Sequence, residues 1–142
     1  MTRVDFYLLS QQQPTAQEQF VCRLTEKAFR LGHRIFLHGK DEQQARKLDE
    51  LLWTFRDRSF IPHGLAADVD AEPDFPVVIG SGEAPRGDYD LLINCADDIP
   101  DFFSRFERVV ETIPNEDQAK ARGRTRYRFY RDRGYPLEMH RL

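Results

Sequence analysis

Residues 4–38, VDFYLLSQQQPTAQEQFVCRLTEKAFRLGHRIFLH, decide the fold, because they predict a strand, a helix and a second strand in that order. The two ends of this stretch, Val4–Leu9 and His33–His38, contain short apolar runs with aromatic and β-branched residues, which are typical of strands. Between them, apolar residues from Phe20 to Leu31 recur at helical spacing, and Gly32 follows as a helix-ending residue. Such alternation is typical of an α/β sheet covered by helices.

The rest of the chain continues this alternation. The further elements that we predict are a helix over residues 41–53, an extended piece at 59–63, a loop at 66–76, a strand at 77–79, a turn-rich loop at 80–88, a strand at 89–95, a helix over 99–112 and a last helix from 115 or 117 to 134. Together they predict one α/β domain over residues 1–142, with a Rossmann-like three-layer fold in which a mostly parallel sheet is flanked by helices. We expect its crossover connections to be right-handed.

Helix starts carry their own signals. Thr15 and Glu18 have the spacing of a capping box, in which each side chain accepts a hydrogen bond from the other residue's main chain. Asp41 is a predicted N-cap for the second helix. Asp98 and Pro100 occupy the N-cap and first positions of the predicted helix over 99–112.

The composition indicates a soluble globular protein. Hydrophobic residues make up 40% of the 142 residues and charged residues 32%. The apolar runs are far shorter than the roughly 20 residues of a membrane span, and the N-terminus lacks the features of a signal peptide, so we expect a cytoplasmic protein that does not bind membranes. Cys22 and Cys95 both lie in apolar stretches, which predicts buried, reduced thiols.

The sequence lacks the motifs of nucleotide sites and of common catalytic sites. The loop at 10–14, SQQQP, contains no glycine that would let the backbone approach a phosphate, and the GSG at 80–82 does not continue into a phosphate-binding pattern. The neighbouring acids Asp97 and Asp98 are interpreted as helix-capping residues rather than as a catalytic pair. We therefore predict no nucleotide-binding loop, no cofactor, no metal site and no catalytic site.

Positive charge is concentrated at the end of the chain. From residue 119 onward, eight Lys and Arg face two acids, giving +6, whereas the preceding 118 residues hold thirteen basic and twenty-two acidic groups, giving −9. In the last predicted helix, one strip of the helix surface contains the side chains of Lys120, Arg124, Tyr127, Arg128 and Arg131. This strip fits a solvated surface, a nucleic-acid site in which tyrosines stack on bases, or a site for an acidic peptide whose carboxylates are held by arginines. The acidity of the remaining chain favours the peptide over a long polyanion.

Six stretches along nearly the whole chain resemble the chi subunits of the bacterial DNA polymerase III holoenzyme, whereas residues 68–86 do not resemble them closely. They are FYLL at 6–9, QFVCRL at 19–24, DEQQARKLDELLW at 41–53, SFIPHGLA at 59–66, VVETIPNED at 109–117 and RYRFYRDRGY at 126–135. The resemblance implies a non-catalytic accessory subunit of the clamp-loader assembly that acts in DNA replication. It also implies two partners: the psi subunit, and the acidic C-terminal tail of single-stranded DNA-binding protein, which ends in Pro-Phe. We expect such a protein to be monomeric alone and not to bind DNA directly.

The resemblance also implies which residues form each site. One shared pocket for the tail would have the walls Trp53, Phe60, Pro62 and Tyr127 and the charged groups Lys120, Arg124 and Arg128. The psi subunit would bind the helix over 99–112 through Ile99, Phe102 and Phe106.

Alternatives to these assignments remain open. Trp53, Phe60 and the three residues of the psi site are also explained as ordinary core. The whole function has one alternative, a module that binds single-stranded nucleic acid directly through the basic, aromatic last helix. Gly123 is expected to make this helix less rigid, since glycine costs about 1 kcal/mol relative to alanine in a helix.

Overall fold

The structure, a computed structural model, describes residues 1–56, 60–66 and 74–142. Its elements are β1 (Arg3–Leu8), α1 (Ala16–Arg30), β2 (Ile35–His38), α2 (Glu42–Thr54), β3 (His63–Leu65), β4 (Val77–Gly80), β5 (Leu91–Asn94), the 3-10 turn η1 (Phe103–Arg105), β6 (Arg108–Ile113), α3 (Asp117–Asp132) and β7 (Leu137–Arg141). The strands form one seven-stranded sheet in the order β3-β4-β2-β5-β6-β1-β7, and every neighbouring pair is parallel. The predicted α/β fold with a parallel sheet and flanking helices is therefore confirmed.

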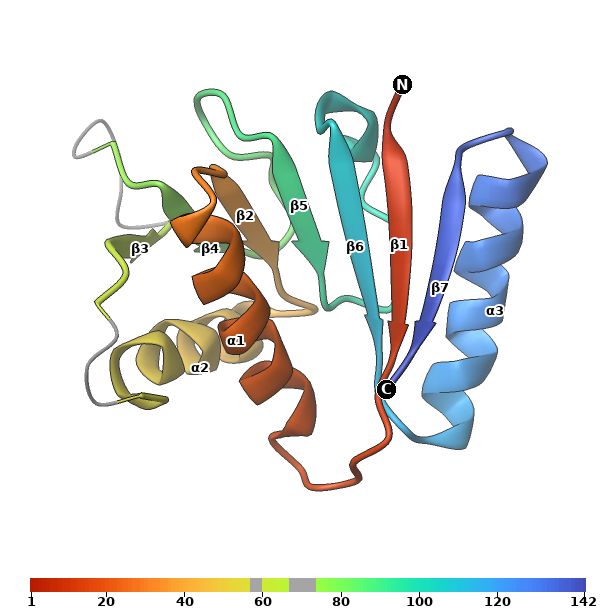
Figure 1. The fold of residues 1–142 in the computed structure, drawn as a ribbon, viewed down its shortest axis with the longest axis horizontal. Coiled ribbons are helices and arrows are strands. Elements are labelled where there is room, and N and C mark those ends of the chain that lie inside the picture. The colour runs from red at the N-terminus through yellow and green to blue at the C-terminus, as the bar shows by residue number, and fades with distance from the viewer. Residues whose placement is uncertain (57–59, 67–73) are drawn as a thin grey trace.

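The sheet separates two hydrophobic cores, because successive strand residues point to opposite faces. Ile35 and Leu37 of β2 pack into the core beneath α1 and α2, whereas Phe36 between them packs into the core that holds Tyr130 of α3. Helices α1 and α2 thus cover one face and α3 the other. Figure 1 shows α1 and α2 together on one side and α3 beside β7 at the opposite end of the sheet.

The predicted helix over residues 99–112 is wrong. Only the short turn η1 is helical there, and the chain then enters β6, which is paired on both sides by β1 and β5. The run from Val109 to Ile113 is rich in β-branched residues and buried on both faces, as a central parallel strand requires. Phe102, Phe103 and Phe106 have helical spacing in the sequence, but in the structure they are buried in the core that also holds Tyr130.

Two of the three predicted caps fail. Asp41 does cap α2, with the Gln44 amide donating to its carboxylate over 2.8 Å. The side chain of Thr15, by contrast, makes no capping bond, and Glu18 accepts a hydrogen bond from the side chain of Gln44 instead, over 3.0 Å. Asp98 starts no helix, since the next helical residues are those of η1, whose N-cap is Phe102; the Asp98 carbonyl accepts a hydrogen bond from the side chain of Asn94 instead.

Several shorter predictions have mixed outcomes. Both cysteines are buried and free, and burial raises the pKa of each thiol to about 12. Strand β7 was not predicted, although Leu137–Arg141 alternates apolar and polar residues as a half-buried strand does. Residues 57–59 of the predicted extended piece and 67–73 of the predicted loop lie outside the described residues. Over the described parts of the chain, no helix combines the length and the apolar character that crossing a bilayer requires.

Candidate functional site

Helix α3 and strand β7 enclose a groove of about 590 Å³. It is lined by Leu8, Leu9, Ser10, Ile113, Lys120, Gly123, Arg124, Tyr127, Arg128, Arg131, Met139, Arg141 and Leu142. The predicted strip along the last helix is confirmed as one surface, since all five of its residues line this groove. Its opposite wall comes from β7, and the ends of β1 and β6 supply an apolar floor of Leu8, Leu9 and Ile113.

The close packing of α3 on the sheet depends on Gly123. A Cβ atom at this position would overlap Cδ1 of Ile113, and it would lie 3.1 Å from Cγ1 of the same side chain. Ile113 is itself buried on the sheet face beneath the helix. Gly123 therefore has a packing role that the sequence did not predict, while its predicted effect on helix rigidity stays a prediction.

The groove is strongly cationic. Five basic side chains line it, and the lining residues that the structure describes include no Asp or Glu; the five are Lys120, Arg124, Arg128, Arg131 and Arg141. No ion pair joins Lys120, Arg124 or Arg128 to any described carboxylate, whereas Arg131 contacts the adjacent Asp132. The three unpaired cations are therefore available to an anionic ligand.

Tyr127 supplies an aromatic wall. Its ring lies edge-on against Phe6 of β1, with 5.4 Å between the ring centroids, and it is half-buried. This contact fixes the ring between the cations of α3 and the apolar floor. A ligand that carries acids and one large apolar group would match this arrangement of charge and apolar surface.

The position of the groove follows from the strand order. The connection after β1 leads through α1 to one face of the sheet, while the connection after its neighbour β6 leads through α3 to the other face. In open α/β sheets, ligands bind where connections from adjacent strands diverge in this way, at the carboxyl ends of those strands. Leu8 and Ile113, the last residues of β1 and β6, lie at this divergence.

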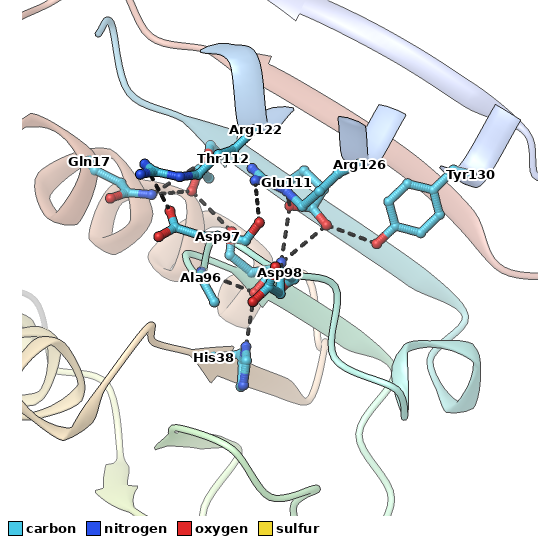
Figure 2. Close-up of polar contacts among 11 residues, drawn as sticks. Gln17, His38, Ala96, Asp97, Asp98, Glu111, Thr112, Arg122, Arg126 and Tyr130 are labelled. Atoms are coloured by element: carbon cyan, nitrogen blue, oxygen red, sulfur yellow. Dashed lines mark hydrogen bonds and ion pairs between the residues drawn. The ribbon is translucent and has the colours of Figure 1, made fainter. Parts of the chain in front are cut away.

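Beneath α3, a buried network holds the helix in its orientation (Figure 2). Glu111 of β6 is fully buried and accepts hydrogen bonds from Arg126 Nε at 2.9 Å, from the Tyr130 hydroxyl at 2.8 Å and from Asn94 at 3.1 Å. Burial raises the pKa of the Glu111 carboxyl, and the Arg126 charge opposes that rise. Arg126 also donates to the Asp97 carbonyl at 2.8 Å. This arginine is therefore structural, although its neighbours two residues away line the groove.

The network continues across the sheet to the turn after β4. The amide of Gly82 donates to His38 Nε2 over 3.2 Å, so the proton of the neutral ring lies on Nδ1, which donates to Asn94 Oδ1 over 2.9 Å. Burial lowers the pKa of His38 and favours this neutral form. His38 thereby sets the orientation of the Asn94 amide, whose nitrogen faces Glu111.

The other predicted walls of the pocket lie elsewhere. Trp53 and Phe60 are 51% and 70% exposed, their ring centroids are 5.8 Å apart, and Pro62 is half-buried nearby in the chain. Trp53 belongs to α2, on the face opposite α3, and neither aromatic residue lines the groove. The prediction that Trp53, Phe60 and Pro62 share one cavity with Tyr127 is wrong.

The predicted right-handed crossovers would account for this separation. The chain moves from β1 to β2 toward one end of the sheet, and from β6 to β7 toward the other end. Right-handed connections that run in opposite directions place their helices on opposite faces. The sequence does not specify the strand order, so it does not specify which helices share a face.

The residues predicted for the psi site lie mostly in the core. Phe102 and Phe106 are 8% and 3% exposed, and both pack near the ring of Phe36, at centroid distances of 5.9 and 6.4 Å. Ile99 is half-buried. Their assignment to a psi site stays a prediction, but only Ile99 presents appreciable surface.

Three groove residues of β1 and β7 were missed by sequence reasoning: Leu8, Met139 and Arg141. The spacing of Leu137, Met139 and Arg141 places them on one face of a strand, which is the signal that the unpredicted strand would have supplied. Recognising β7 would therefore have added an apolar and a cationic residue to the predicted site.

One cluster of potential metal ligands occurs among the described residues, where Asp5, Glu138 and His140 lie on β1 and β7. Asp5 contacts His140 Nε2 at 2.9 Å and Arg108 Nε at 2.8 Å through its two oxygens. Burial opposes ionisation of Asp5, but these hydrogen bonds outweigh it and lower the pKa. Both oxygens of Asp5 are engaged, so ion pairing between strands accounts for the cluster.

Comparison with known proteins gives consistent matches over nearly the full chain. Residues 1–138 match the family model described as DNA polymerase III chi subunit, HolC. The chain is 48% identical to DNA polymerase III subunit chi of Pseudomonas aeruginosa over 142 residues, covering 100% of this chain and 98% of that protein. It is 35% identical to the subunit of the same name from Escherichia coli, covering 96% of each chain, and 30% identical to that from Haemophilus influenzae, covering 93% and 92%.

Proposed function

The chain belongs to the DNA polymerase III chi subunit family, and from this premise we propose that it is an accessory subunit without a catalytic site of its own. In this proposal it links the psi subunit of the clamp-loader assembly to the acidic C-terminal tail of single-stranded DNA-binding protein. The family assignment supports a role in DNA replication. The cationic groove along α3 is the observation that supports binding of the tail.

The groove offers the two kinds of contact that an acidic tail ending in Pro-Phe needs. The carboxylates would pair with Lys120, Arg124 and Arg128, which have no carboxylate partner among the described residues. The terminal ring would lie over the floor of Leu8 and Ile113. Tyr127 would then bound the ring on the side of α3. Trp53, Phe60 and Pro62 lie on another surface, so we omit them from the tail site.

A peptide titration tests the tail proposal. A synthetic peptide of aspartates followed by Pro-Phe is titrated into the wild type and into Arg124→Ala and Arg128→Ala by isothermal calorimetry. Each substitution removes a charge-assisted contact and is expected to weaken binding about tenfold, equivalent to about 1.4 kcal/mol. Because the site is exposed, raising the salt concentration should weaken wild-type binding as well.

Arg122→Ala is the matched control. Arg122 lies on the same helix and pairs with Asp97 at 3.8 Å, outside the groove. Its removal should change the affinity by less than about 0.5 kcal/mol. Equal effects of Arg122→Ala and Arg124→Ala would contradict the proposed site. Tighter binding of a bare single-stranded oligonucleotide than of the peptide would favour direct nucleic-acid binding instead.

For psi, the proposal has two candidate surfaces. The predicted one, Ile99 with Phe102 and Phe106, offers mainly Ile99 to a partner. The exposed pair Trp53 and Phe60 forms an apolar patch on the other face, and such patches often mark protein contacts. To distinguish the two surfaces, purified psi is titrated into the variants Ile99→Asp and Trp53→Ala. The surface whose variant loses binding is the psi site. If both variants bind psi as well as the wild type does, neither surface is the site.

A further inference from the structure

Strand β7 is an edge strand, and two of its residues, Met139 and Arg141, line the groove. It is the last strand of the sheet and pairs only with β1 among the described residues. Unpaired edges are templates for the addition of another extended chain. Figure 1 shows β7 at the end of the sheet next to α3, which forms the opposite wall of the groove.

The register of β7 shows which main-chain groups are free. Val4 donates its amide to the Pro136 carbonyl at 2.9 Å, and Leu142 donates to the Leu8 carbonyl at 3.1 Å. In a parallel ladder, alternate residues of a strand bond to the same neighbour. The N–H groups of residues 138, 140 and 142 therefore face β1, whereas those of residues 137, 139 and 141 face outward.

The free main-chain groups belong to residues that also line the groove. Met139 and Arg141 contribute their side chains to it, and Met139 is 40% exposed. Strand addition combines main-chain hydrogen bonds with side-chain pockets, and both occur here at the same residues. The five cations around the groove select an acidic chain as the occupant.

We propose that an acidic peptide with an aromatic carboxyl-terminal residue binds this groove as an eighth strand, hydrogen-bonded to the outward main-chain groups of Met139 and Arg141. The inference rests on the proposed function, because it concerns the same groove and the same class of ligand. The apolar floor lies at the carboxyl ends of β1 and β6, while Arg128 and Arg131 lie farther back along α3. A peptide with its terminal ring over the floor and its acids beside these arginines runs parallel to β7.

The test compares Met139→Pro with Met139→Ala. Proline removes the outward N–H but leaves the ladder to β1 intact, which edge strands tolerate. Alanine removes the same side chain and keeps the N–H. Affinity for a fluorescein-labelled peptide of aspartates ending in Pro-Phe is measured by anisotropy, and folding is checked by circular dichroism. We expect Met139→Pro to bind at least about fivefold more weakly than Met139→Ala, because one main-chain hydrogen bond is lost.

A second measurement uses the wild type and does not depend on the folding of a variant. Hydrogen exchange at single amides should show that the peptide protects Met139 and Arg141, while Glu138 and His140 remain as protected as before. Two further peptides carry N-methyl groups, one on its odd-numbered and the other on its even-numbered amide nitrogens. Only one of the two should bind more weakly than the unmodified peptide, since alternate amides of a strand face one neighbour.

The outcomes separate this inference from the proposed function. Loss of binding in Arg124→Ala, together with equal affinities of Met139→Pro and Met139→Ala and no new protection at Met139, would overturn the eighth strand and leave the tail site standing. Absence of peptide binding to the wild type would overturn both. If Met139→Pro does not fold, the exchange measurement on the wild type decides the question.

Discussion

Arginines two positions apart in α3 have different roles. Arg126 is 6% exposed and paired with the fully buried Glu111, whereas Arg124 and Arg128 are exposed in the groove. A step of two residues turns a helix through about 200°, so Arg126 points away from the side of the helix that carries Arg124 and Arg128. The basic stretch therefore combines a structural arginine with arginines available to a ligand.

The Glu111 network should be important for stability. Replacing Glu111 by Ala leaves the Arg126 charge buried without its partner, and we expect a loss of about 3–5 kcal/mol in the free energy of unfolding. Tyr130→Phe removes one hydrogen bond and should cost about 1–2 kcal/mol. Urea denaturation measures both. A smaller loss for Glu111→Ala than for Tyr130→Phe would contradict the role given to the ion pair.

Gly123→Ala should destabilise the protein, although alanine is the better helix former. The added Cβ overlaps the buried Ile113 side chain, and we expect a cost of about 1–3 kcal/mol in thermal or urea unfolding. The double variant Gly123→Ala/Ile113→Val removes the overlapping methyl group and should recover part of the loss. As a control, Ala121→Gly at an exposed position should cost about 1 kcal/mol. A stabilising Gly123→Ala would show that the helix does not approach the sheet this closely.

At the scale of elements, strands with clear apolar runs were predictable and the others were not. Strands β1, β2, β4 and β5 follow from their sequences because buried parallel strands are nearly continuously apolar. Strand β6 was not predicted, because the phenylalanines before it have helical spacing and favoured one long helix. Strand β7 was missed because three of its five residues are polar. Their place in the sheet is stabilised by tertiary contacts, such as the pair between His140 and Asp5, which the local sequence does not show.

The pairing of β7 with β1 should depend on pH. Hydrogen bonds from His140 and Arg108 lower the pKa of Asp5 below its ordinary value of 3.8. A carboxyl with a lowered pKa in the folded state contributes stability that is present above the ordinary value and lost as the pH falls through the lowered one. We therefore expect the wild type to lose stability below about pH 4 more steeply than Asp5→Asn, as measured by urea denaturation across pH. Parallel curves for the two proteins would contradict this role of Asp5.

At the scale of the molecule, two surfaces lie on opposite faces of one sheet. The cationic groove lies along α3, whereas the exposed Trp53 lies on α2 and the exposed Phe60 lies in the segment before β3. The sequence near the basic end of the chain predicts that Lys120, Arg124, Tyr127 and Arg128 share one surface. This prediction was possible because helical spacing depends only on residues that are close together in the sequence. The combination of Tyr127 with Trp53 was wrong because it depends on strand order, which is not local. The two surfaces are therefore separated by the full thickness of the sheet.

The most direct measurement is a peptide titration followed by amide chemical shifts in two-dimensional NMR. If the acidic tail binds the groove, the shifts that change should belong to α3 from Lys120 to Arg131, to β7 and to the end of β1. Trp53 and Phe60 should remain unchanged at saturation. Shifts concentrated at Trp53 and Phe60, with α3 and β7 unaffected, would contradict the proposal that the cationic groove receives the acidic chain end.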